Sequence, residues 1–512
     1  MLTAKMLSYA LPDGRMLFQN LNFTIEKKKY GLVGINGVGK STLVKIIAGE
    51  FEFSSGQRIG ISKAIYLPQW EDRPEMAAGE YLVDIWEGTE ATLREALLKD
   101  LDLSISLSAL SGGQWMRVRL LRALSKVGEL LILDEPTNDL DRESRESLYE
   151  FIRHYQKGLL VISHDRKLLD DVDEIWELTN QGLTVYGGNF TFYDEQKTAE
   201  RTLLADRIAT ARKEKKKQAR EHLEKLERQE KRTRLAEKKA PDMGLPRIIL
   251  GGRKRQAQVS LGKIHTAEQE RDQKRAAEFR ELFEKKKQSS ELRIDFSLGA
   301  KPKGKVIFSL EDFNCRYARS ETPLWREPLN FTLHAGERVV IRGENGAGKS
   351  TLLKILTGVL ASEACERIGR FSAILRKFIY LDQSYSLLDD KQNIMDTILN
   401  DCRFDQTEAR NRLADYGFTG ESVFKSVHVL SGGERLRLCL AKLAFSRQTP
   451  EVWILDEPAN NLDLESLAIL EAALREYDGT LLVVSHDERF IERISCGQVL
   501  TLVSAQKNRG AR

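Results

Sequence analysis

The sequence predicts an α/β fold built from two similar repeats, with a long, charged helical segment between them. Three observations support this prediction. Four short motifs occur twice in the same order, and the two copies of each motif stand 309 to 322 positions apart. Short apolar runs lead into polar or glycine-rich loops, as strands buried on both faces of a parallel sheet do. The run 197–239 contains neither glycine nor proline and consists mainly of strong helix formers.

The duplication also predicts where the domains begin and end. A repeat of four motifs in one order indicates two homologous domains, which we place at 1–195 and 303–512, with the segment 196–302 joining them. Charge follows the same division. The stretch 197–290 holds 28 Lys and Arg against 15 Asp and Glu, whereas the rest of the chain holds 52 against 61. The net charge of +4 therefore conceals one basic segment between two acidic bodies.

The first elements expected in each repeat are a short strand, a glycine loop and a helix. Strands over 31–33 and 338–341 precede helices over 41–47 and 350–356. The loops between them have the pattern Gly-x-x-Gly-x-Gly-Lys-Ser-Thr, which contains the phosphate-binding P-loop motif. Its glycines let backbone N–H groups converge on phosphate oxygens at the N-terminus of a helix. The predicted nucleotide-binding residues are Gly34, Asn36, Gly37, Gly39, Lys40, Ser41 and Thr42, and Gly343, Asn345, Gly346, Gly348, Lys349, Ser350 and Thr351.

Acidic pairs follow the next strands. Further buried strands are expected over 130–133, 159–162, 452–455 and 481–484. Asp134 and Asp456 end two of them, where a carboxylate meets the magnesium side of a P-loop. Adjacent side chains of an extended chain point to opposite faces, so we expect Glu135 and Glu457 to face a water instead. A turn or helix cap before the next proline is the alternative role for these acids.

Two more motifs recur. His164 and His486 stand in Ser-His-Asp after buried strands. A single histidine there would most simply be a structural hydrogen-bonding group, but its recurrence favours a contact to the γ-phosphate. The Leu-Ser-Gly-Gly motifs provide a second glycine-rich helix start in each repeat. Since one P-loop already holds the phosphates, we expect each of these motifs to face the nucleotide of the other repeat, through Ser111, Gly112 and Gly113 and through Ser431, Gly432 and Gly433.

In this order, the four motifs resemble the ATP-binding cassette superfamily over both repeats. The resemblance implies that two cassettes sandwich two ATP molecules head to tail, and that the protein is an Mg²⁺-dependent ATP hydrolase with two active sites. Site one would combine Lys40, Ser41, Asp134, Glu135 and His164 with Ser431 and Gly433. Site two would combine Lys349, Ser350, Asp456, Glu457 and His486 with Ser111 and Gly113. By the same resemblance, Gln69 and Gln383 approach Mg²⁺ beside the serines and aspartates, and Tyr9 and Tyr317 stack on adenine.

The joining segment predicts an antiparallel helical hairpin. One helix is expected over 197–239, the sequence 240–246 breaks it, and a second helix runs from about 256 or 263 to 288. At about 1.5 Å per residue, the first helix would reach about 60 Å, more than the connection of two domains requires. Charged runs of this kind are usually solvated faces. The tip near 240–258, however, concentrates bases that suit a phosphodiester backbone, namely Arg247, Arg253, Lys254 and Arg255, with Lys263 close by.

Tandem cassettes, no run that could span a membrane and a charged hairpin between the cassettes together resemble the ABC-F family of ribosome-associated ATPases. The run Tyr186–Tyr193 is similar to a Tyr-x-Gly-Asn-Tyr pattern that precedes the family's linker. The resemblance implies a monomer that occupies the tRNA exit site of the ribosome, where it meets rRNA. The tip 240–258 would reach the peptidyl-tRNA and the peptidyl-transferase centre. ATP binding would favour association, and hydrolysis would favour release.

The sequence also allows other functional interpretations. No apolar run approaches the ~18–20 residues that cross a bilayer, and five scattered cysteines fit neither a zinc site nor a disulfide framework, so we expect a cytoplasmic protein. The ATP-binding subunit of a transporter with a separate transmembrane partner is the alternative, although it leaves the linker unexplained. The short first repeat and long tip resemble the antibiotic-resistance branch of the family, without excluding a housekeeping translation factor. Asp139, Ala459 and Asn461 depart from the family's Asp-Glu-Pro-Thr-Asn-His-Leu-Asp motif, which leaves the equivalence of the two sites open.

Overall fold

The protein is described by a computed structural model. The described residues are 1–60, 63–83, 91–99, 101–126, 128–138, 140, 142–239, 304–317, 322–344, 346–360, 365–373, 377–382, 384–447, 450–459 and 462–505. The chain divides into two compact bodies. One contains Met1–Tyr193 with Leu292–Arg512 and so includes both repeats, and the other contains Asp194–Glu291.

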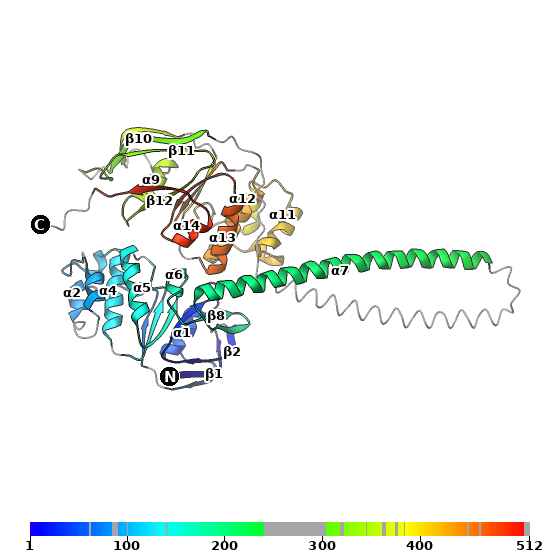
Figure 1. The fold of residues 1–512 in the computed structure, drawn as a ribbon, viewed down its shortest axis with the longest axis horizontal. Helices are drawn as coiled ribbons and strands as arrows, with labels where there is room; N and C mark the ends of the chain where they lie inside the picture. The colour runs from blue at the N-terminus through cyan, green and yellow to red at the C-terminus, as the bar shows by residue number, and fades with distance from the viewer. Residues whose placement is uncertain are drawn as a thin grey trace. The chain divides into compact units, whose positions relative to one another are not determined.

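Each repeat contains a mainly parallel sheet and a three-stranded antiparallel sheet (Figure 1). In the first repeat the parallel sheet has the order β5(Ala64–Leu67), β6(Leu130–Asp134), β7(Gly158–Ile162), β3(Lys29–Val33), β8(Glu174–Thr179) and β9(Gly182–Tyr186), and only the β8–β9 pair is antiparallel. The smaller sheet has the order β2(Met16–Ile25), β1(Leu2–Ala10) and β4(Ser55–Ile59).

The second repeat has the same strand order. Its parallel sheet contains β14(Phe378–Leu381), β15(Val452–Asp456), β16(Thr480–Val484), β12(Arg338–Gly343) and β17(Gln498–Leu502). Its antiparallel sheet contains β11(Leu329–His334), β10(Val306–Tyr317) and β13(Cys365–Ala373). The predicted α/β class with two duplicated sheets is therefore confirmed, and every strand expected from an apolar run lies within one of these parallel strands.

Helices cover both faces of each parallel sheet. The first repeat has α1(Lys40–Ala48), α2(Ala78–Tyr81), α3(Ala91–Leu98), the 3₁₀ turn η2(Leu107–Ala109), α4(Gly112–Ser125), α5(Arg142–His154) and α6(Arg166–Leu169). The second has α9(Lys349–Leu356), α10(Ile394–Leu399), α11(Gln406–Leu413), η4(Ala414–Tyr416), η5(Gly420–Phe424), η6(Val427–Val429), α12(Gly432–Phe445), α13(Leu464–Glu476) and α14(Glu488–Arg493). Among the described residues, no helix has both the length and the apolar composition needed to cross a membrane.

The cores follow from the two-residue period of the strands. All five residues of β6 are buried. Leu131 and Leu133 pack in the apolar cluster that includes α4, whereas Leu130 and Ile132 belong to the cluster that includes α1. The strand β15 alternates in the same way between two clusters. Full burial of one such side chain contributes about 1.5–3 kcal/mol. Packing on both faces of the sheet therefore holds each strand in place, and with it the residue that ends the strand.

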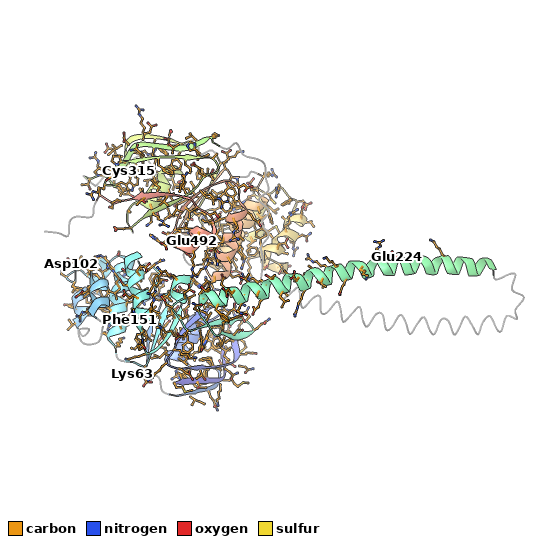
Figure 2. The ribbon with its side chains drawn as sticks, viewed as in Figure 1. Lys63, Asp102, Phe151, Glu224, Cys315 and Glu492 are labelled. Carbon is orange, nitrogen blue, oxygen red and sulfur yellow. The ribbon has the colours of Figure 1, made fainter. Side chains whose placement is uncertain are left out.

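Helix α7(Phe190–Lys239) begins seven residues before the predicted start of the linker helix. Phe190 and Tyr193 are buried in the core of the first repeat, and Asn189 Oδ1 accepts a hydrogen bond from the backbone N–H of Phe192 at 3.2 Å. Packing and this N-terminal cap together set the beginning of the helix. Further along, Arg220 Nε donates to Glu224 Oε1 at 3.2 Å, an i,i+4 pair on the exposed part of the helix (Figure 2). The predicted second helix, the tip and the basic residues Arg247, Arg253, Lys254, Arg255 and Lys263 lie outside the described residues.

The two repeats contact each other through buried charge. Arg166 Nη1 lies 2.5 Å from Glu471 Oε1, and Arg493 Nη1 lies 3.0 Å from the other oxygen of the same carboxylate. Arg166 and Glu471 are only 3% and 2% exposed. A buried charge is tolerated because it is paired, so loss of one partner costs far more than loss of an exposed pair.

We therefore expect Glu471→Ala to lower the free energy of unfolding by about 3–5 kcal/mol, because it leaves the buried guanidinium of Arg166 without a carboxylate. The control is Glu408→Ala, which removes the exposed i,i+4 pair with Arg412 and should cost less than about 1 kcal/mol. Urea unfolding of both variants measures the difference. Equal losses would show that the contact between the repeats is not a buried ion pair.

Candidate nucleotide-binding sites

The two P-loops curl tightly over the starts of α1 and α9. Gly39 and Gly348 precede these helices in the left-handed conformation, with φ of 104° and 84°. A Cβ at Gly39 would lie 2.6 Å from a methyl group of Leu17, and one at Gly348 would lie 2.5 Å from Leu324. Glycine fits both the backbone angle and the space at these two positions. At α1, the residues of the loop and of the first turn line the cavity described below.

Each P-loop lysine is buried against its own loop. Lys40 Nζ donates to the carbonyl oxygens of Gly34 at 2.6 Å and Ile35 at 3.2 Å. Lys349 Nζ makes the equivalent bonds to Gly343 at 2.9 Å and Glu344 at 3.1 Å. Burial lowers the pKa of both lysines, although nearby carboxylates oppose the shift. A cation held in this way is suited to bind an incoming anion such as a phosphate.

The aspartates that end β6 and β15 are fixed by tyrosines. Tyr66 donates its hydroxyl to Asp134 Oδ2 at 3.1 Å, and Tyr380 donates to Asp456 Oδ2 at the same distance. Burial raises the pKa of Asp134, although hydrogen bonds from Ser41 and Tyr66 oppose the rise. Sequence reasoning missed these tyrosines. The available signal was their recurrence three residues before Gln69 and Gln383.

The backbone at Glu135 and Glu457 differs from the predicted extended conformation. They do not lie on extended chain but adopt the left-handed conformation, with φ of 50° and 49°. Their backbone N–H groups still donate to the neighbouring strands, at Ile162 O and Val484 O. Left-handed backbone costs about 1–2 kcal/mol for such residues. Its presence at both equivalent positions indicates that the turn is needed to aim the carboxylates.

The turn brings each glutamate to a histidine. His164 Nε2 lies 3.3 Å from Glu135 Oε1, and His486 Nε2 lies 3.3 Å from Glu457 Oε1. His486 Nε2 also lies 3.0 Å from Lys349 Nζ. The structure therefore brings together the predicted glutamate and histidine in both repeats, and in the second it adds the P-loop lysine.

Burial dominates the electrostatics of the first pair. It raises the pKa of Glu135 to about 8, against the opposing charge of Lys40. Burial, helped by Lys40, lowers the pKa of His164 to about 3. Burial also raises the pKa of Glu457, while Lys349 and Arg145 oppose that rise. Near neutral pH, Glu135 thus holds a proton that it can exchange, beside an uncharged imidazole.

A cavity of about 1010 Å³ joins residues of both repeats. The first repeat contributes Asn36, Gly37, Gly39, Lys40, Ser41, Thr42, Gln69, Asp134, Glu135 and His164, all predicted site residues. The second contributes Gly432, Glu457 and His486. Asp463, which sequence reasoning missed, accepts a hydrogen bond from the backbone N–H of Asn36 at 3.0 Å. One P-loop is thus in direct contact with the opposite repeat.

Other predicted residues lie elsewhere. Tyr9 does not line this cavity, whereas Leu11, Arg15 and Leu17 do. The hydroxyl of Tyr317 lies 2.7 Å from that of Thr351 on α9. Ser111 and Ser431 cap the fourteen-residue helices α4 and α12, but neither lines the cavity. Other predicted residues that do not line the cavity are Gly34, Gly112, Gly113, Gly433, Asp456 and the second P-loop residues Gly343, Gly346, Lys349 and Ser350. Asn345 and Gln383 lie outside the described residues.

Comparison with known proteins identifies the family. The family model described as ABC transporter matches residues 18–138 and 327–460, one match in each repeat. The chain is 31% identical to the ribosome protection protein VmlR of Bacillus subtilis (strain 168), over 95% of this chain and 84% of that protein. The chain belongs to the ABC-F family of ATP-binding cassette proteins. Its repeats are therefore ATP-binding cassettes, named cassette one and cassette two below, and the protein is an ATP hydrolase.

Further comparisons agree with this assignment. The chain is also 31% identical to the ATP-binding protein Uup of Caulobacter vibrioides, over 96% of this chain and 75% of that protein. An archaeal ribosome recycling factor, solved in complex with a ribosomal stalk protein, has the same tandem fold with a TM-score of 0.61. That match covers 97% of this chain and 87% of the other at 19% identity, so it establishes the fold alone.

The raised pKa of Glu135 has a consequence for stability. The folded protein holds a proton on Glu135 up to about pH 8, whereas an unfolded glutamate releases it near pH 4.5, so ionisation disfavours the fold as pH rises between these values. We expect Glu135→Gln to stabilise the protein increasingly from pH 5 to pH 8 and by a constant amount above that. Thermal unfolding over pH 5–9 measures this, with the exposed Glu150→Gln as control. A pH-independent effect of Glu135→Gln would refute the raised pKa.

Proposed function

We propose that this protein is a ribosome-bound ATPase in which two ATP molecules, each with Mg²⁺, control a basic linker between the cassettes. The observation that carries the proposal is the joining of two cassettes with complete acidic sets by a segment of 28 basic and 15 acidic residues. A phosphate backbone is the partner that such a surplus suits. VmlR, at 31% identity, is named a ribosome protection protein, which supports the ribosome as that partner.

The residues at the P-loops fit a magnesium ion bound with ATP. The hydroxyl of Ser41 hydrogen-bonds with Asp134. Among the described residues, Asp456 Oδ1 is buried and has no hydrogen-bond partner. Such a carboxylate oxygen is the kind of ligand that Mg²⁺ prefers. We assign the ion to Ser41, Gln69 and Asp134 at site one and to Ser350, Gln383 and Asp456 at site two. Bound Mg²⁺ would offset charge on the β- and γ-phosphates.

The remaining residues then have distinct roles in hydrolysis. Lys40 and Lys349 exchange their loop carbonyls for phosphate oxygens, a stronger charge-assisted contact. Glu135 and Glu457 orient the attacking water, and each can accept its proton when its own carboxyl is ionised. His164 and His486 each lie 3.3 Å from the glutamate, close enough to orient its carboxylate when nucleotide binds.

Each ATP is proposed to lie between the P-loop of one cassette and the Ser-Gly-Gly motif of the other. Gly432 lines the same cavity as the first P-loop, and Asp463 contacts Asn36. Both support a contribution of cassette two to site one. The duplication assigns Ser111 and Gly113 to site two in the same way. Since one chain supplies both halves of both sites, the protein is expected to act as a monomer.

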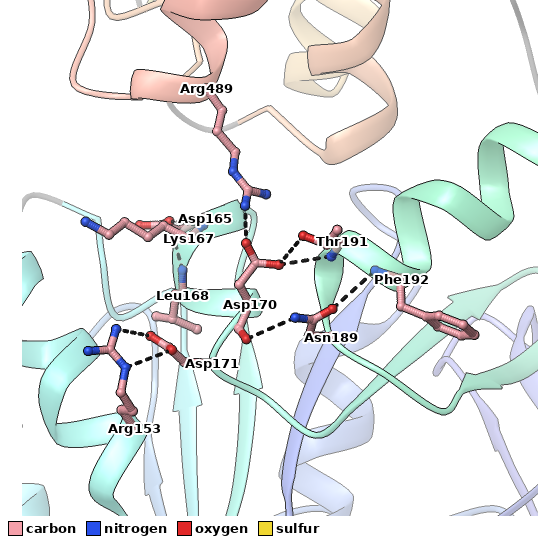
Figure 3. Close-up of polar contacts among 10 residues, drawn as sticks. All are labelled: Arg153, Asp165, Lys167, Leu168, Asp170, Asp171, Asn189, Thr191, Phe192 and Arg489. Atoms are coloured by element: carbon pink, nitrogen blue, oxygen red, sulfur yellow. Dashed lines mark hydrogen bonds and ion pairs between the residues drawn. The ribbon is translucent and has the colours of Figure 1, made fainter.

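Asp170 connects the cassettes to the start of the linker helix (Figure 3). Its carboxylate pairs with Arg489, which lies three residues after His486 on α14. The same carboxylate accepts hydrogen bonds from the backbone N–H and the hydroxyl of Thr191, both at 2.9 Å, in the first turn of α7. A change at His486 on ATP binding can therefore reach α7 through one carboxylate.

The linker tip 240–258 is proposed to contact RNA through Arg247, Arg253, Lys254, Arg255 and Lys263. We place the protein in the tRNA exit site, with the tip at the peptidyl-tRNA and the peptidyl-transferase centre. ATP binding favours association with the ribosome, and hydrolysis favours release. The name of VmlR supports a role in ribosome protection. We propose protection against antibiotics, which expression in a drug-sensitive strain would separate from a housekeeping role.

A substitution at Asp170 tests its place between the cassettes and α7. We expect Asp170→Asn to abolish the ATP-dependent change in hydrogen exchange at the first turn of α7 while retaining ATP hydrolysis. Asp171→Asn is the matched control, because the neighbouring Asp171 pairs with Arg153 of the same cassette at 3.1 Å and 3.2 Å (Figure 3). Identical exchange in the two variants would contradict this role.

The ribosome proposal is tested with the double variant Glu135→Gln/Glu457→Gln, which should bind ATP and fail to hydrolyse it. We expect it to sediment with ribosomes in a sucrose gradient containing ATP. Replacing Arg253, Lys254 and Arg255 by alanine should weaken that association and flatten its salt dependence, with basal hydrolysis near normal. A double variant found only at the top of the gradient would overturn the proposal, and one found with membranes would favour a transporter subunit.

A further inference from the structure

We propose that Arg145 of cassette one serves ATP site two in trans and makes the two sites unequal. The inference rests on the head-to-tail arrangement proposed above and concerns a residue that none of the recurring motifs contains. Arg145 lies in the first turns of α5(Arg142–His154). It lines the same cavity as Glu457 and His486 of cassette two.

One hydrogen bond and one electrostatic interaction locate the side chain of Arg145. Arg145 Nε donates to the backbone carbonyl of Leu140 at 3.1 Å, which fixes the base of the guanidinium. The guanidinium lines the same cavity as Glu457 and interacts electrostatically with its carboxyl. Lys349 approaches from its own P-loop, whereas Arg145 approaches from the other cassette. Glu457 at site two is therefore influenced by two cations, one from each cassette.

The duplication shows that site one has no matching arginine. The acidic and histidine motifs of the two cassettes stand 322 positions apart, so the counterpart of Arg145 is Leu467. Leu467, on α13, lines the same cavity and is 2% exposed. The same place in the two cassettes thus offers a guanidinium to site two and an apolar side chain to site one.

A guanidinium at this position has a defined chemical use. In phosphoryl transfer, negative charge spreads over the γ-phosphoryl oxygens in the transition state, and a cation placed there lowers the barrier. The planar fork of an arginine can bind two such oxygens at once. The alternative is that Arg145 only supports the turn at Leu140, in which case loss of its charge would affect both sites alike or neither.

The test uses Arg145→Gln, which removes the charge but keeps an N–H donor for the Leu140 carbonyl, and Arg145→Lys, which keeps the charge. Arg117→Gln is the matched control, because Arg117 also donates to a backbone carbonyl, that of Lys99 at 2.9 Å, and does not line the cavity. ADP trapped with vanadate is counted for each cassette after cleavage at a protease site engineered between them. Steady-state kcat and KM are measured in Glu135→Gln, which leaves site two intact, and in Glu457→Gln, which leaves site one intact.

We expect Arg145→Gln to lower the kcat of site two by about 10–100-fold with a smaller change in KM, and to abolish vanadate trapping on cassette two alone. Arg145→Lys should restore part of the trapping. Equal losses at both sites, or no loss at site two, would overturn the proposal. Ser431→Ala separates this result from the head-to-tail arrangement, because it should impair site one. If Ser431→Ala impairs site two instead, the arrangement itself is wrong and the assignment of Arg145 falls with it.

Discussion

The buried positive charge of each P-loop organises the groups around it. Lys40 and Lys349 are 8% exposed, and each has backbone carbonyl oxygens within hydrogen-bonding distance. A desolvated cation is stable only when paired or hydrogen-bonded, so an anion that replaces these carbonyls has a strong and specific place to bind. The glycines that curl the loop, the strands that deliver Asp134 and Asp456, and the left-handed turns at the glutamates all arrange groups around that charge.

Contacts between the cassettes lie next to the first of these charges. Site one receives Asp463 and Gly432 from cassette two, and the cavity continues to Glu457 and His486. Ion pairs also join the two cassettes. One of them links Arg489 to Asp170, whose carboxylate also accepts a hydrogen bond from Thr191 in the first turn of α7. The nucleotide site, the boundary between the cassettes and the start of the linker helix therefore share a continuous set of polar contacts.

Much of the fold and of each site could be predicted because the signals are local. Apolar runs in the sequence predicted the positions of β6, β7, β15 and β16. Each motif likewise predicted which of its own residues belong to a site. Contacts between distant segments could not be predicted in this way. The hydroxyl of Tyr66 reaches a strand 68 residues away, and Asp463 reaches a loop 427 residues away. The left-handed Glu135 was missed because alternation along a strand says nothing about the residue that ends it. The start of α7 was placed too late, since its anchors Phe190 and Tyr193 are set by burial.

We propose that each ATP lies between the P-loop of one cassette and the Ser-Gly-Gly motif of the other within a single chain. The most direct measurement is disulfide formation between cysteines introduced by Asn36→Cys and Ser431→Cys, in the background of the glutamate-to-glutamine double variant, with the parent variant as control for the native cysteines. We expect a cross-link within one chain that forms with ATP and is lost with ADP. Absence of a cross-link with ATP, or a cross-link that joins two chains, would contradict it.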